Sequence, residues 1–104
     1  MPVGRRFTRT SRFCRSPEVA SRTIADEVLV VPIRRNPMEK LGIYSLNPTA
    51  SFLWKKLDGG CTVGVLARQL CARYQVDPAR ARADVETFLQ DMLSAGAVTM
   101  RSEG

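Results

Sequence analysis

The sequence predicts an α+β fold of winged-helix type, in which a three-stranded antiparallel sheet precedes three helices. Segments rich in β-branched residues occupy the first half of the chain, and apolar residues at helical spacing occupy the second half. A length of 104 residues favours a single domain. We expect residues 1–16 to form a basic, disordered tail and residues 17–104 to form the folded domain.

Three strands are expected, at 22–24, 27–33 and 41–46. The dipeptide Ala25-Asp26 is the expected turn between the first two. Residues 34–40 are polar and contain Asn36-Pro37, which is typical of a loop. A meander of antiparallel strands is the simplest connection.

The helices are predicted from residues that cap helix ends. Asn47 followed by Pro48 begins a helix that runs to about Leu57. A second helix starts at Thr62 or Val63 and ends near Tyr74. The apolar faces of these two helices are predicted to be Ala50, Leu53, Trp54 and Leu57, and then Val63, Leu66, Ala67, Leu70 and Tyr74.

The third helix has the clearest signals. Asp77-Pro78 supplies a cap and a first residue, and Gly96 supplies the stop. Its apolar stripe comprises Ala81, Val85, Phe88, Leu89, Met92 and Leu93. Residues 97–100 then either form a last short strand or pack onto the core.

The basic charge lies mainly in the tail. The chain carries a net charge of +6, but five arginines and no acid fall in the first 16 residues, which leaves the remainder at +1. A solvated arm is one interpretation of the tail, and an electrostatic arm for nucleic acid or an acidic partner is the other. The third helix has two arginines against four acids, so it would be repelled by phosphate.

The residue inventory argues against catalysis. The chain has no histidine, and its three cysteines form no CxxC pair. We therefore predict no catalytic residue, no metal site and no cofactor, and we interpret Cys61 and Cys71 as packing residues. No apolar run suggests a signal peptide or a membrane span, so we expect a cytoplasmic location and no membrane partner.

The predicted third strand points to a function. It contains no proline and no inward charge, so at a sheet edge its backbone would offer a template for an extended peptide. Tyr44 and Leu46 should share the core face, with Leu41, Ile43 and Ser45 on the other. The predicted peptide-binding residues are Leu41, Gly42, Ile43, Tyr44, Ser45 and Leu46 from this strand, and Val85, Phe88, Leu89 and Met92 from the third helix. The same open edge allows a homodimer.

The pattern also resembles the PqqD family. The matching positions are Tyr44, Leu46, Asn47, Thr49, Ala50, Trp54, Asp58, Gly59, Thr62, Val63, Leu66, Ala67, Leu70, Tyr74, Asp84, Val85, Phe88, Leu89, Leu93 and Gly96. This resemblance covers roughly residues 18–100. It implies a non-catalytic domain that binds the leader of a ribosomally made precursor peptide, along the third strand and against the third helix.

The resemblance further implies a modifying enzyme as partner, which in the pyrroloquinoline quinone pathway is a radical S-adenosylmethionine enzyme. The Arg-rich tail and the 34–40 loop depart from the family pattern, which leaves open whether the pathway is that one or another peptide pathway. Nucleic acid is not the expected partner. The alternative function is a winged-helix nucleic-acid-binding regulator that uses the basic N-terminal tail.

Overall fold

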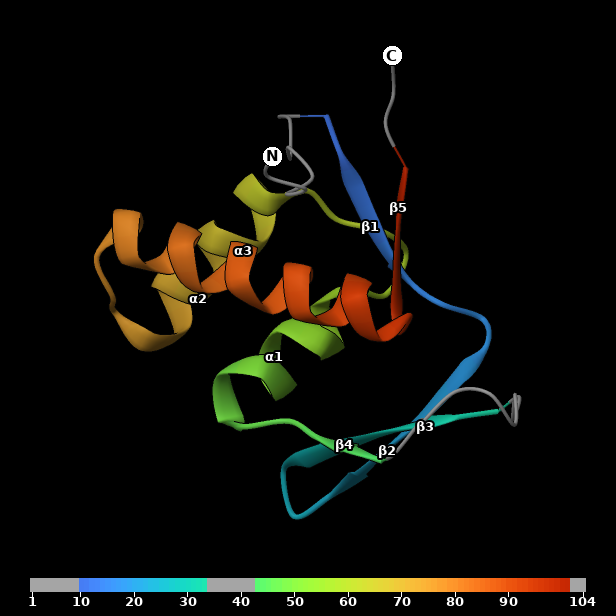
Figure 1. Ribbon diagram of the computed structural model, residues 1–104. Coiled ribbons are helices and arrows are strands. Elements are labelled where there is room, and N and C mark those ends of the chain that lie inside the picture. The colour runs from blue at the N-terminus through green and yellow to red at the C-terminus, as the bar shows by residue number, and fades with distance from the viewer. Residues whose placement is uncertain (1–9, 34–42, 102–104) are drawn as a thin grey trace.

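A computed structural model describes residues 10–33 and 43–101. The elements follow the order β1 (Arg12–Arg15), β2 (Val19–Ile24), β3 (Glu27–Pro32), β4 (Tyr44–Ser45), α1 (Pro48–Lys56), α2 (Val63–Tyr74), α3 (Pro78–Ala95) and β5 (Val98–Arg101). The predicted α+β class, with a three-stranded antiparallel sheet and three helices, is confirmed. A second sheet pairs β1 with β5 (Figure 1).

The three-stranded sheet is an antiparallel meander in the order β2-β3-β4. Ala25 and Asp26 join β2 to β3 as predicted, and both have positive φ, at 50° and 71°. This is the backbone conformation of a two-residue turn whose twist matches that of a hairpin. Val28 and Val30 turn their side chains into the core, so one face of β3 is buried. The predicted 34–40 loop lies outside the described residues. β4 pairs with β3 through Leu29↔Ser45 and Val30↔Tyr44.

Each helix begins at its predicted cap. The side chain of Asn47 accepts a hydrogen bond from the N–H of Ala50 at 2.7 Å, and Thr62 accepts from the N–H of Val65 at 3.3 Å. Asp77 accepts from the first backbone N–H groups of α3, and Gly96 ends that helix at φ 77°. These caps satisfy backbone groups that a helix end leaves unpaired.

The core lies where α1, α2 and α3 meet the inner face of β3. Its largest fully buried side chains include Trp54, Phe13, Leu53, Leu57, Leu66, Leu70 and Leu89. The predicted apolar faces of the helices are buried or half-buried, with one exception. Tyr74, in the last turn of α2, is 37% exposed, because it packs edge-on against the ring of Phe52 at 5.7 Å instead of entering the core.

The predicted limit of the tail is wrong, because β1 belongs to the folded domain. Phe13 is fully buried, and its N–H and C=O pair with the backbone of Cys61 at 2.8 and 3.1 Å. Arg15 donates to the C=O of Trp54 at 2.7 Å and stacks on its ring. The burial of Phe13, its backbone pairing with Cys61 and the contacts of Arg15 with Trp54 together anchor this arginine-rich segment. The rest of the predicted tail, residues 1–9, lies outside the described residues.

Candidate functional site

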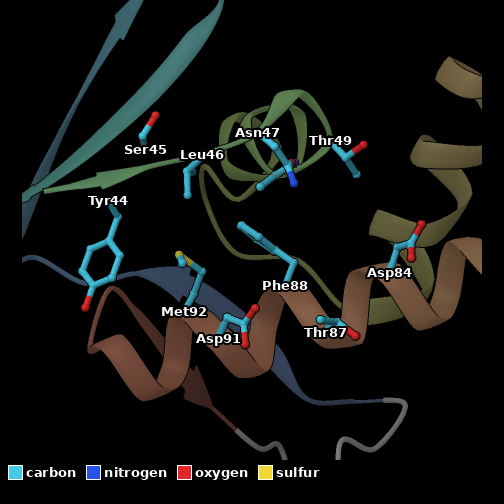
Figure 2. Close-up of a pocket in the computed structure, with 11 residues that line it drawn as sticks. Tyr44, Ser45, Leu46, Asn47, Thr49, Asp84, Thr87, Phe88, Asp91 and Met92 are labelled. Atoms are coloured by element: carbon cyan, nitrogen blue, oxygen red, sulfur yellow. The ribbon is translucent and has the colours of Figure 1, made fainter.

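A groove opens between α3 and the segment that runs from β4 into α1 (Figure 2). Its volume is about 550 Å³. The residues that line it are Tyr44, Ser45, Leu46, Asn47, Thr49, Ala50, Asp84, Thr87, Phe88, Asp91 and Met92. Two segments that are some 40 residues apart in the sequence thus form its two walls.

The first wall is fixed by hydrogen bonds between β3, β4 and α1. The N–H of Leu46 donates to the C=O of Val28 at 2.9 Å, which continues the ladder beyond Ser45. The hydroxyl of Ser51, which is 2% exposed, then accepts from Val28 and donates to the C=O of Leu46. Leu46 is thereby held over the core, and Asn47 turns the chain into α1 beside the groove.

The second wall is one face of α3. Phe88 and Met92 are four residues apart, so they lie one above the other, and both point toward Leu46 across the groove (Figure 2). Each is only 6% exposed, which makes them its apolar floor. Asp84, Thr87 and Asp91 form the more exposed rim on the same helix.

The backbone of β4 has a defined outward side. Leu46 donates to Val28, so the pairs Val28–Leu46 and Val30–Tyr44 are the hydrogen-bonded pairs of the ladder. The intervening residue, Ser45, must point its N–H and C=O away from β3. Among the described residues, no strand lies on that side of β4. The next residue of β3 whose backbone faces β4 is Pro32, which has no N–H to extend the ladder.

The structure gathers some of the predicted binding residues and separates others. Tyr44, Ser45 and Leu46 line the groove with Phe88 and Met92. Ile43 precedes them and is 65% exposed, whereas Leu41 and Gly42 lie outside the described residues. The expected alternation is present over 43–46, where Leu46 is buried, Tyr44 is half-buried, and Ile43 and Ser45 are exposed.

Val85 and Leu89 were predicted to line the groove, but they do not. Both are fully buried in the core, together with Ala81. Each residue of a helix is rotated by 100° from the one before, so the row through 81, 85 and 89 faces the other helices. The row through 84, 88 and 91 faces the groove instead.

Six lining residues were missed by sequence reasoning, namely Asn47, Thr49, Ala50, Asp84, Thr87 and Asp91. The spacing of 84, 87, 88, 91 and 92 places these residues on one helical face, so this row was visible in the sequence. Asn47, Thr49 and Ala50 were considered only as the start of a helix. Nothing local indicates that this helix start forms a wall.

The thiol of Cys61 has a shifted pKa. Burial raises its pKa above the ordinary value of 9.0; Arg12 opposes the shift, Cys14 adds to it and Lys56 opposes it. The thiol also donates to the C=O of Lys56 at 2.9 Å, away from the groove. Within residues 10–33 and 43–101, no group of three or more His, Cys, Asp or Glu is placed to hold a metal ion. No helix in the same ranges is long and apolar enough to cross a membrane.

Comparison with known proteins identifies the family. The model of the family described as "Coenzyme PQQ synthesis protein D (PqqD)" matches residues 27–98. The chain belongs to the PqqD family. The match spans β3 to the start of β5, and so includes both walls of the groove. No curated protein matches the sequence significantly.

Solved structures share the fold of this PqqD-family domain. TbiB1 in complex with the TbiA(beta) leader peptide is 22% identical, with a TM-score of 0.73, and the match covers 86% of this chain and 99% of that one. Lasso peptide synthetase B1 complexed with the leader peptide is also 22% identical, with a TM-score of 0.68 and coverage of 84% and 96%.

A third structure is a solution NMR structure from Methylobacterium extorquens. It represents the PqqD truncation of PqqCD as a functional, stand-alone recognition element for ribosomally synthesised and post-translationally modified peptides. It is 20% identical, with a TM-score of 0.69, and the match covers 90% of this chain and 95% of that one. The alternative of a winged-helix regulator gains no support from the family match or from these structures.

Proposed function

We propose that this PqqD-family domain is a non-catalytic module that binds the leader of a ribosomally made precursor peptide and presents it to a modifying enzyme. The observation that carries the proposal is the outward backbone of Ser45, which lies directly beside the groove. A peptide that pairs with β4 satisfies these backbone groups and extends the sheet. Its alternate side chains then point toward the floor of Phe88 and Met92.

Family membership supports this assignment. Two of the structures that share the fold are complexes with leader peptides, and the third is a recognition element for modified peptides. The modifying enzyme is a radical S-adenosylmethionine enzyme if the pathway is that of pyrroloquinoline quinone. Because precursor peptides of this kind are made on ribosomes, we place the domain in the cytoplasm.

An NMR titration tests the site. The ¹⁵N-labelled chain is titrated with synthetic 20-residue peptides that tile the short open reading frames beside its gene. We expect one peptide to shift the amide signals of residues 43–46 and 84–92. Shifts confined to another surface contradict the proposed groove, and the absence of binding by every peptide contradicts the leader-binding function.

A pair of proline variants tests strand addition. Ser45→Pro removes the outward N–H of β4 and leaves the ladder with β3 intact. Ser21→Pro is its matched control on the opposite edge of the same sheet. The N–H of Ile33 donates to the C=O of Glu18, so the hydrogen-bonded pairs fall at 18, 20 and 22, and Ser21 also points its N–H outward.

We expect Ser45→Pro to abolish peptide binding and Ser21→Pro to preserve it. Unchanged affinity in a folded Ser45→Pro variant contradicts pairing at β4. If Ser45→Pro does not fold, Ile43→Pro gives the same test. Ile43 is two residues earlier, so its N–H also points away from β3. Light scattering on each variant shows whether the β4 edge instead pairs two copies of the chain.

A further inference from the structure

The groove is acidic although the chain is basic. The chain has a net charge of +6, yet among the described residues no lysine or arginine lines the groove. Asp84 and Asp91 both line it, on the rim above Phe88. The sign of the charge at the groove is thus opposite to the sign of the whole chain, and a cationic ligand is favoured there.

The two carboxylates differ in their partners. Asp84 forms an ion pair with Arg80 at 3.4 Å, one helical turn away. Asp91 has no ion pair within the part of the chain that the structure describes, and its side chain lies beside Phe88 and Met92 (Figure 2). Glu86 also lies on α3, but it pairs with Arg82 at 3.3 Å and does not line the groove. Asp91 is therefore the carboxylate that a ligand can reach without displacing a cation.

The geometry restricts where the cation of a ligand sits. A peptide added to β4 presents every second side chain to α3, at a rise of about 6.7 Å for two residues. Along α3, Asp91 lies about 4.5 Å from Phe88 and adjacent to Met92, given a rise of 1.5 Å per residue. A large apolar side chain seated on Phe88 and Met92 thus leaves the next side chain on the same face within reach of Asp91.

We propose that the groove selects a leader segment in which a lysine or arginine stands two positions from a large apolar residue. The apolar side chain packs on Phe88 and Met92, and the cation pairs with Asp91. This inference rests on the proposed function and adds to it the chemical class of the leader. An ion pair at an exposed site stabilises a complex only modestly. In this arrangement Asp91 therefore determines which peptides bind and contributes little to how tightly they bind.

A selection from a phage-displayed library of random 12-residue peptides tests this inference. The baits are the full chain, Asp91→Asn and the matched control Glu86→Gln. We expect the peptides selected by the full chain and by Glu86→Gln to be enriched in Lys or Arg two positions from a large apolar residue. Asp91→Asn should keep the apolar preference and lose the basic one.

An affinity measurement on one selected peptide makes the test quantitative. We expect Asp91→Asn to weaken its binding about threefold, the size typical of an exposed ion pair. Replacing the peptide's basic residue by methionine should remove the difference between Asp91→Asn and the full chain. A difference that persists with the methionine peptide overturns the proposed pairing.

The selection separates failure of this inference from failure of the proposed function. Selected peptides that share the apolar residue but show no basic preference overturn the charge preference and leave leader binding intact. A library from which the full chain enriches nothing overturns both.

Discussion

The backbone N–H of Val28 donates a hydrogen bond of 3.0 Å to the hydroxyl of Ser51, 23 residues further along the chain. In a regular ladder this N–H would bond to the C=O of Leu46, which instead accepts from the same hydroxyl at 3.1 Å. Ser51 thus stands between the two strands at the point where they separate. It lets the chain leave the sheet and enter α1 without leaving either buried group unpaired.

We predict that Ser51→Ala destabilises the fold by about 1–3 kcal/mol, because a buried N–H and a buried C=O lose their partner. Urea unfolding followed by circular dichroism measures the change. Ser94→Ala on the exposed side of α3 is the control and should stay within about 0.5 kcal/mol of the unmodified chain. Equal stabilities for the two variants contradict the bridging role of Ser51.

Phe13 should contribute as much as a residue at the centre of the core. It is fully buried although it lies in an arginine-rich segment, so we predict that Phe13→Ala costs about 3–5 kcal/mol. Ile24→Ala is the comparison, since Ile24 is an apolar strand residue that is 52% exposed. Thermal unfolding of both variants distinguishes them. A loss for Phe13→Ala no larger than that for Ile24→Ala shows that β1 does not support the core.

A bulky residue on the rim of the groove should block it without disturbing the fold. Thr87 is exposed and lines the groove, whereas Gln90 is exposed on the same helix and does not. We predict that Thr87→Trp weakens leader-peptide binding at least about tenfold, or 1.4 kcal/mol, and that Gln90→Trp has no effect. Fluorescence anisotropy of a labelled peptide measures both. Similar affinities for the two variants place the peptide elsewhere.

From the raised pKa of Cys61 we predict that the fold loses stability in alkaline solution. Burial raises the pKa of its thiol in the folded state above 9.0. As the pH rises past 9.0, the unfolded chain releases this proton before the folded chain does, so the free energy of unfolding falls. Cys61→Ser should lack this part of the decline. Urea unfolding from pH 8 to 10.5 tests it, and parallel curves for the two proteins contradict it.

The helices were predictable because their ends are encoded locally. Asn47, Thr62 and Asp77 each cap the helix that was assigned to them, and Gly96 ends α3 as expected. Such signals depend on side chains that bond to a backbone three or fewer residues away. A third strand was predicted at 41–46, and the structure describes β4 at Tyr44–Ser45. Whether this strand lies at an edge was left open by the sequence, and the order β2-β3-β4 answers it.

The features that sequence reasoning missed depend on distant partners. β1 pairs with β5 across more than 80 residues, and a lone Phe13 among arginines gives no strand signal by itself. Ser51 resembles any polar residue within a helix until Val28 is known to lie beside it. The division of α3 between core and groove required the positions of both its neighbours. One apolar stripe from Val85 to Met92 could not indicate which residues face which side.

The pairing of β1 with β5 places the first and last strands of the described chain side by side. Arg12 stands opposite Arg101 in the register, and antiparallel neighbours of this kind lie roughly 5 Å apart. Figure 1 shows this strand pair on the far side of the molecule from β4. These two strands therefore lie together, away from the groove. A polypeptide or surface tethered at Arg12 or Arg101 leaves the groove uncovered, so attachment of the domain to a larger assembly there is compatible with access to the groove.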